Sequence, residues 1–415
     1  MSSAAPASVS ASRTPTPASQ RGPSSPARRR VKVPPLYSYL ARVPDPRDPR
    51  GRRHPLAAIL ALTCLAMLSG IHGYLPAAEW ARKLSKRQRK KLGFRKGRTP
   101  AASTLYEVLK VLSWEALEGE LRAWMADAEL RETPAEGKTA RTGDPAGLAL
   151  DGKTARGSWK RGADIAHMLS VVTHALGLTL AQAPVARKRG ELTAARPLLQ
   201  QLLLDGLVVT VDAQFTQPDV ARTILARGGD YVMRVKKNQP TLLAEVEALL
   251  SPAHYERGHR SSVVTHDVGH GRVEERQLVV HPLAPGELDW PGAAQVFVVI
   301  SKVTQRNPGT QPRPAPVLTR IYGVTSLKPE AADAARLLRL YRGHWSVESK
   351  VFWVRDKVMG EDASPVATGN IVAVLASLRG AVLNIIRGAG YQGTARAIRE
   401  FNGGRTAALR ALGCP

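Results

Sequence analysis

The sequence contains few cysteines, few aromatic residues and few acidic residues. Of its 415 residues only Cys64 and Cys414 are cysteines, and aromatic residues make up 5%. The low number of cysteines excludes a disulfide framework and a zinc site built from cysteines, and it suits a reducing compartment. The 43% hydrophobic content can instead supply a large apolar core, divided over two or three domains.

Long hydrophobic runs are missing as well. The most apolar run, from Leu56 to Leu68, has 13 residues, whereas a membrane-spanning helix needs about 20. We therefore expect a buried helix there, no membrane partner and a cytoplasmic protein. Residues 1–34 are rich in Ser, Pro, Ala and Arg, without an acidic residue or a signal-peptide pattern, so we expect a disordered basic arm.

Negative charge is scarce throughout the chain. Sixty Lys and Arg against 34 Asp and Glu give a formal net charge of +26, and residues 82–98 hold ten basic residues and no acidic one. Such a surplus is typical of a protein that binds a polyanion, although a merely soluble or membrane-attracted cationic protein would also show it. The expected DNA contacts in this run are Arg82, Lys83, Lys86, Arg87, Lys90 and Lys91.

Several common catalytic motifs are absent too. The sequence has no GxxxxGK[ST] phosphate loop, no GxSxG nucleophile turn and no HExxH zinc motif. The sequence therefore offers no candidate for these three kinds of active site.

Hydrophobic periodicity divides the chain into two folded parts. Residues 35–130 read as a small helical domain, and a linker at 131–147 separates it from an α/β domain at 148–387, with a basic tail at 388–415. In the α/β domain three strands that can form a meander are followed by helix, strand, helix and strand. This order predicts a ribonuclease-H-like core. A mostly β insertion at about 252–324 separates this core from a helix that reaches residue 340 and continues into the stretch around Glu348.

Two aspartates, each at the end of an apolar strand-like run, are the first candidates for chemistry. Asp151 follows Leu148–Leu150, and Asp212 follows Leu207–Val211. If the two strands are neighbours, the carboxylates lie close together, which is costly without a cation between them. With Glu348 as a third ligand, they predict a site for two Mg²⁺ ions, with Mn²⁺ as a substitute. Alternatively, Asp151 belongs to a plain turn and Asp212 caps a helix.

The stretch from Tyr341 to Arg355 supplies the third carboxylate. Read as an α-helix, it places His344, Glu348 and Arg355 on one side, with Tyr341 one turn earlier. The alternative is an ordinary amphipathic helix that buries Val347, Val351 and Val354 and leaves its charges in solvent.

These residues belong to a set of sequence blocks by which the chain resembles the DDE-class insertion-sequence transposases, specifically the H-repeat-associated (ISAs-type) group. The resemblance covers roughly residues 36 to 387. Its blocks are Val43–Arg47, Arg53–Leu60, Asp151–Ser158, Val211–Ala213, Gly229–Val232, Lys237–Gln239, Gly269–Arg276, His344–Trp345 with Glu348, Trp353 and Asp356, and Gly360–Asp362.

The resemblance implies a ribonuclease-H-like catalytic domain with Asp151, Asp212 and Glu348 as the catalytic, metal-binding triad. The wider group has a tyrosine, arginine, glutamate and lysine signature; here His344 stands in place of the arginine and Arg355 in place of the lysine. The residues expected to position DNA are Lys153, Tyr341, His344, Trp345 and Arg355, with tryptophan stacking on a flipped base weighed against core packing.

The sequence thus predicts a bacterial DNA transposase. It would bind terminal inverted repeats, cleave at the element ends, join the 3′-hydroxyls to target DNA, and act as a homodimer on double-stranded DNA at the nucleoid. Two alternatives remain: a domesticated or degenerate nuclease of the same fold, and a non-catalytic DNA-binding regulator that uses the helical domain alone.

Overall fold

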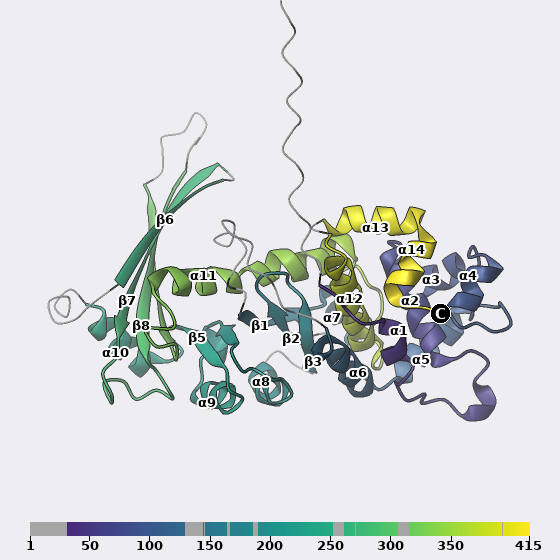
Figure 1. The fold of residues 1–415 in the computed structure, drawn as a ribbon, viewed down its shortest axis with the longest axis horizontal. Helices are drawn as coiled ribbons and strands as arrows, with labels where there is room; N and C mark the ends of the chain where they lie inside the picture. The colour runs from purple at the N-terminus through teal and green to yellow at the C-terminus, as the bar shows by residue number, and fades with distance from the viewer. Residues whose placement is uncertain are drawn as a thin grey trace, which may run out of the picture.

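The computed structural model (Figure 1) describes residues 31–128, 144, 146–163, 167–185, 190–251, 261–269, 271–305, 315–391 and 393–415. Nearly all of the expected basic arm and most of the expected linker lie outside these residues. The description therefore begins at Val31, whose backbone N–H donates to the carbonyl of Gly388 near the other end of the chain.

Six helices form the N-terminal part. They are α1 (Leu36–Leu40), α2 (Leu56–Leu68), α3 (Tyr74–Ala81), α4 (Lys86–Lys91), α5 (Ala102–Val111) and α6 (Trp114–Ala126), with a 3₁₀ turn at Pro49–Gly51. The apolar run predicted to be a buried helix is α2, and every residue in it except Ala57 is buried. A helix that is apolar all round must be enclosed on all sides, which the other helices achieve.

The C-terminal helices complete the same core. They are α12 (Ile371–Gly388), α13 (Thr394–Gly403) and α14 (Arg405–Leu412), and all three pack on α2. Figure 1 shows α13 and α14 beside the N-terminal helices. By length and composition α12 could cross a membrane, but 94% of it is buried inside the protein, as in a core helix. The basic tail expected at 388–415 thus contains two helices and belongs to the helical core.

The α/β part is built on one nine-stranded sheet in the order β3-β2-β1-β4-β5-β9-β8-β7-β6. Its first five strands are β1 (Gly147–Thr154), β2 (His167–Thr173), β3 (Thr179–Val185), β4 (Val208–Val211) and β5 (Asp230–Val235). Strands β1, β4 and β5 are parallel, and β2 and β3 are antiparallel, as the predicted meander requires.

The predicted β insertion is present but does not form a separate layer. Its strands are β6 (Ser261–Gly269), β7 (Arg272–Pro282), β8 (Gln295–Gln305) and β9 (Val317–Thr325). Because β9 pairs antiparallel with β5, the insertion extends the central sheet. In Figure 1 these long strands project well beyond the rest of the sheet.

Helices cover both faces of the sheet. On one face lie α8 (Glu191–Gln200), α9 (Pro218–Ala226) and α10 (Pro240–Leu249). On the other lies α11 (Ala334–His344), whose first turn is capped by Asp333. It leads into two π-helical turns, η6 (Glu348–Phe352) and η7 (Val354–Val358), here together called the π segment. Three valines of this stretch are buried against the sheet, as the amphipathic reading predicts: Val347, Val351 and Val354.

Candidate active site

Asp151 and Asp212 are neighbours, as the sequence predicts. The parallel pairing of β1 with β4 ends at Leu150 and Val211, and each aspartate is the next residue of its chain. Since side chains alternate along a strand, both aspartates point to the face covered by α11 and the π segment. Asp151 does not end its strand, however. Strand β1 continues to Thr154 because its antiparallel partner β2 runs on beyond the end of β4.

The carboxyl group of Asp151 is largely buried among other acidic groups. Burial raises its pKa to about 7; the Gly152 N–H lowers it, while Asp212, Glu348 and Glu191 raise it further. Asp212 also caps the 3₁₀ turn Ala213–Phe215, since its carboxylate accepts from the Gln214 backbone N–H at 3.0 Å. The structural role considered for Asp212 therefore exists alongside its place beside Asp151.

Glu348 lies on the exposed side of the π segment. Its charge acts on Asp151, but among the described residues no three His, Cys, Asp or Glu side chains are already arranged to hold a metal ion. The structure thus brings Asp212 and Glu348 into electrostatic range of Asp151, but it does not form a closed coordination shell from the described residues.

The side chains at this point nevertheless suit a hard divalent cation. Carboxylate oxygens are the ligands that Mg²⁺ and Mn²⁺ prefer. When burial and neighbouring charges disfavour the ionised form of a carboxyl, a bound cation would stabilise that form. The raised pKa of Asp151 is the observation that supports this fit between the site and a divalent cation.

Glu191 is a fourth acidic residue that sequence analysis missed. It is buried at the start of α8, forms an ion pair with His167, and accepts a hydrogen bond from Gln214. A Cβ atom on Gly152 would lie 2.5 Å from the side chains of Glu191 and His167. The Asp-Gly pair is therefore explained by this close approach and not by a turn. In the sequence, only Gly152 itself could have indicated that Glu191 lies so close.

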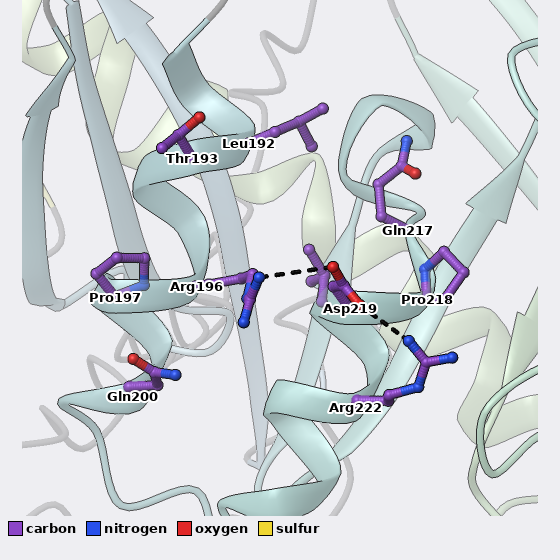
Figure 2. Close-up of a pocket in the computed structure, with 10 residues that line it drawn as sticks. Leu192, Thr193, Arg196, Pro197, Gln200, Gln217, Pro218, Asp219 and Arg222 are labelled. Carbon is purple, nitrogen blue, oxygen red and sulfur yellow. Dashed lines mark hydrogen bonds and ion pairs between the residues drawn. The ribbon is translucent and has the colours of Figure 1, made fainter.

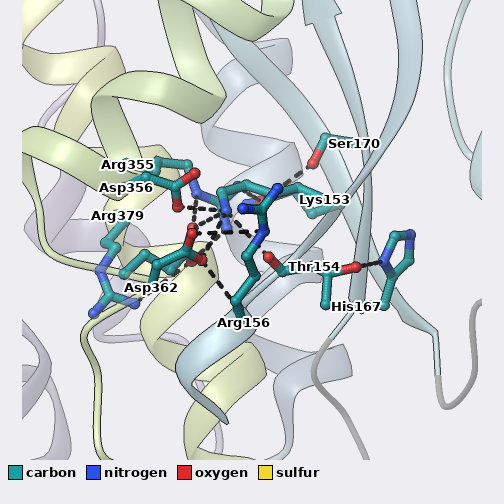
Figure 3. A network of polar contacts seen from close by, with 11 residues as sticks. Lys153, Thr154, Arg156, His167, Ser170, Arg355, Asp356, Asp362 and Arg379 are labelled. Atoms are coloured by element: carbon teal, nitrogen blue, oxygen red, sulfur yellow. Dashed lines mark hydrogen bonds and ion pairs between the residues drawn. The ribbon is translucent and has the colours of Figure 1, made fainter. Parts of the chain in front are cut away.

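Lys153 and Arg355, which we expected to position DNA, are buried. Their side chains are 6% and 1% exposed, and both bind acidic groups of the protein (Figure 3). Arg355 holds Glu361 through two hydrogen bonds of 2.7 and 2.9 Å. The expected shared face with Glu348 assumed α-helical spacing, whereas a π turn contains more residues and rotates Arg355 away. This arrangement disagrees with the direct phosphate contact expected of Lys153 and Arg355.

His344 is likewise buried. Its Nδ1 lies 3.1 Å from the hydroxyl of Thr210, which also contacts His174 at 2.9 Å. Burial lowers the pKa of His344 to about 4, although Asp212 acts in the opposite direction. The ring is therefore neutral at neutral pH and supplies no positive charge for a phosphate, which corrects the role expected for it.

Tyr341 and Trp345 do lie at an open surface. Both line a hollow of about 450 Å³ between α11 and strands β7 to β9, together with Arg276 and Arg342. The Trp345 side chain is 40% exposed, and its ring lies 5.7 Å from the guanidinium carbon of Arg234. These two predicted DNA-contact residues remain accessible to a ligand.

The expected basic surface is centred on α4. A capping box formed by Ser85 and Gln88 starts this helix. Five of the six predicted contact residues are exposed and Lys91 is half-buried: Arg82, Lys83, Lys86, Arg87, Lys90 and Lys91. Arg89 is half-buried and donates to the carbonyl of Arg82 at 2.5 Å.

A second hollow, of about 650 Å³, lies between α8 and α9 on the opposite face of the sheet (Figure 2). Figure 2 shows Arg196 and Arg222 both directed at Asp219, at 3.5 and 2.9 Å. None of the predicted site residues lines it. It therefore has no part in the candidate active site.

Comparison with known proteins agrees with this geometry. A family model described as Transposase DDE domain matches residues 137–385, and one described as DDE_Tnp_1-associated matches residues 37–125. The chain therefore belongs to the DDE transposase family, and its mixed α/β sheet with N-terminal helices is consistent with that family. Membership implies DNA as the substrate and a divalent metal ion as the cofactor.

Individual relatives show which group within the family the chain resembles. The chain is 27% identical over 358 residues to "Putative transposase YncI" of Escherichia coli O157:H7, which covers 85% of this chain and 87% of the relative. It is 28% identical over 360 residues to "H repeat-associated putative transposase YhhI" of Escherichia coli strain K12, covering 85% and 90%. A Xanthobacter autotrophicus protein is 32% identical over 269 residues, covering 64% of this chain and 87% of the relative. The resemblance to the H-repeat-associated group is confirmed.

Proposed function

We propose that the protein is a DNA transposase that cleaves DNA at the ends of its element and joins the 3′-hydroxyls to target DNA. The observation that carries this proposal is the largely buried carboxyl of Asp151 with its raised pKa, beside Asp212 and within electrostatic range of Glu348. The strand order β3-β2-β1-β4-β5, with β1, β4 and β5 parallel, supports a ribonuclease-H-like core.

The chemistry assigned to the site is metal-assisted. Bound Mg²⁺ or Mn²⁺ would activate the attacking water or 3′-hydroxyl and stabilise the leaving oxygen of the phosphodiester. Asp151, Asp212 and Glu348 would hold the cations. Tyr341 and Trp345, at the open hollow, would position the end of the DNA strand.

The helical part would supply affinity for the duplex. Exposed lysine and arginine side chains around α4 displace counterions from phosphates without reading sequence. We also propose a homodimer that acts on double-stranded chromosomal DNA in the cytoplasm, because the two ends of an element must be processed together.

The direct test is an assay with DNA duplexes that carry the element's inverted repeats. With Mg²⁺ the wild type should nick the end and join it to a second DNA. Asp151→Asn, Asp212→Asn and Glu348→Gln should each lower the cleavage rate by at least about a thousandfold. Glu247→Gln, which replaces an exposed carboxylate on α10, is the matched control and should cleave normally.

The outcomes separate the proposal from its alternatives. Cleavage without joining would favour a degenerate nuclease. Binding of end DNA with neither cleavage nor joining would favour a non-catalytic regulator. Unimpaired cleavage by the three variants would show that the carboxylates are misassigned.

A further inference from the structure

A buried cluster of charged side chains lies next to Asp151, on the same face of the sheet. We call it the ionic cluster. It combines three cations with three anions, so that its formal charges cancel: Lys153, Arg355, Arg379, Asp356, Glu361 and Asp362. Figure 3 shows five of these side chains converging from different elements: Lys153, Arg355, Asp356, Asp362 and Arg379.

The contacts within the ionic cluster are close. Lys153 Nζ lies 2.5 Å from Asp356 Oδ1, 3.5 Å from Asp362 Oδ1 and 3.6 Å from Glu361 Oε2. Arg355 grips Glu361 with two nitrogens, and Arg379 approaches the same carboxylate at 3.6 Å. The planar fork of Arg355 thus fixes both the distance and the orientation of its partner.

The ionic cluster joins the two elements that carry the predicted metal ligands. Lys153 is two residues beyond Asp151 on β1, so both side chains leave the strand on the same side. Arg355 belongs to the π segment that begins with Glu348. Arg355 Nη1 also donates to the Gln182 side chain on β3 at 2.9 Å, which ties this segment to the sheet a second time.

Stability alone does not explain such an arrangement. Buried ion pairs are often no more stabilising than apolar residues of similar size, because desolvation offsets their attraction. What they do impose is a single geometry. Although burial raises the pKa of Glu361, the nearby Arg355, Arg379 and Lys153 lower it to about 2, so Glu361 stays ionised at neutral pH.

In the described part of the chain, no ion pairs like those of the ionic cluster hold the side chain of Glu348. Its side chain is exposed and makes no ion pair within the described part of the chain. Where its carboxylate lies is therefore decided by the backbone of the π segment. π-helical turns are frequent at functional sites and need tertiary contacts to persist.

We propose that the ionic cluster is a positioning device, which fixes the π segment against β1 and so places Glu348 relative to Asp151. Arg355 and Lys153 are then positioning residues, and the phosphate-binding role expected from their place in the sequence is not theirs. This inference rests on the proposed function, since it assigns a purpose to the position of Glu348.

The test compares Arg355→Gln with Arg156→Gln. Arg156 is the matched control because its side chain is 80% exposed at the edge of the same cluster. For each protein we would measure Mn²⁺ binding by the paramagnetic resonance of the free ion, the affinity for end DNA at several salt concentrations, and the cleavage rate.

A positioning role predicts that Arg355→Gln weakens Mn²⁺ binding about 10–100-fold and leaves the salt dependence of DNA affinity unchanged. Arg156→Gln should bind Mn²⁺ like the wild type. A phosphate contact at Arg355 would instead lower the salt slope by about 0.9 with normal Mn²⁺ binding, and that result would overturn the inference.

Asp356→Asn guards against a folding failure of the first variant, because its side chain is 23% exposed and holds Lys153 directly. It should also weaken Mn²⁺ binding about tenfold, and unchanged binding would count against the inference. If the wild type neither binds Mn²⁺ nor cleaves end DNA, the proposed function fails. If it does both and the two cluster variants match it, only the positioning role fails.

Discussion

Replacing Asp151 by Asn tests the central feature of the candidate site without any DNA. Burial, reinforced by Asp212, Glu348 and Glu191, raises the pKa of Asp151 from its ordinary 3.8 to about 7. Between these values the folded protein binds more protons at this carboxyl than the unfolded chain does. Stability therefore falls as the pH rises through this window, and it stays low above it.

The size of the stability loss follows from the width of the pH range between the two pKa values. Each pH unit inside it corresponds to about 1.4 kcal/mol, so from about pH 5 to about pH 8 the wild type should lose about 3 kcal/mol of unfolding free energy through this group. Asp151→Asn cannot ionise and keeps that stability. Without divalent cations, the variant should thus gain on the wild type as the pH rises.

Urea unfolding with a chelator present, at about pH 5 and about pH 8, measures this difference. Adding Mn²⁺ at the higher pH should stabilise the wild type and have little effect on the variant, because the cation binds to the ionised carboxylate. Glu247→Gln serves as the control. A stability difference between Asp151→Asn and the wild type that does not change with pH would refute the reasoning.

Three further predictions concern other parts of the molecule. Gly152→Ala should lower the free energy of unfolding in urea by about 1–3 kcal/mol, because the methyl group would clash with a buried ion pair; equal stability would contradict the close approach. Burial raises the pKa of Glu118 to about 7, so Glu118→Gln should remove part of the stability loss between about pH 5 and about pH 7 in urea unfolding; an unchanged pH profile would contradict this. Replacing Lys86, Arg87 and Lys90 by Gln should lower the salt slope of DNA binding, followed by fluorescence anisotropy, by up to about 3. An unchanged slope would mean that α4 does not touch DNA.

The neighbouring positions of Asp151 and Asp212 could be predicted from sequence because both follow short apolar runs typical of buried parallel strands. The position of Arg355 could not. Its expected place beside Glu348 assumed 3.6 residues per turn, and nothing in the local sequence indicates π turns, which depend on tertiary contacts such as the Arg355–Glu361 pair.

The C-terminal helices show a second limit of sequence reasoning. Residues 388–415 were expected to be a basic tail, and they are rich in glycine, including Gly403, Gly404 and Gly413. In the structure these glycines lie at or next to the ends of α13 and α14, whose apolar sides are buried against α2. A short helix is stabilised mainly by the surface that it packs on, and that surface lies more than 300 residues earlier in the chain.

The shared core of the first and last helices bears on how the protein is made. During synthesis α2 leaves the ribosome long before α12, α13 and α14, so the part of its apolar surface that packs on them stays uncovered until these helices are made. A product that stops early would therefore lack a finished scaffold for the basic helix α4 as well as the Arg379 end of the ionic cluster. Only a chain that includes α12, α13 and α14 would combine a folded basic surface at α4 with an assembled ionic cluster.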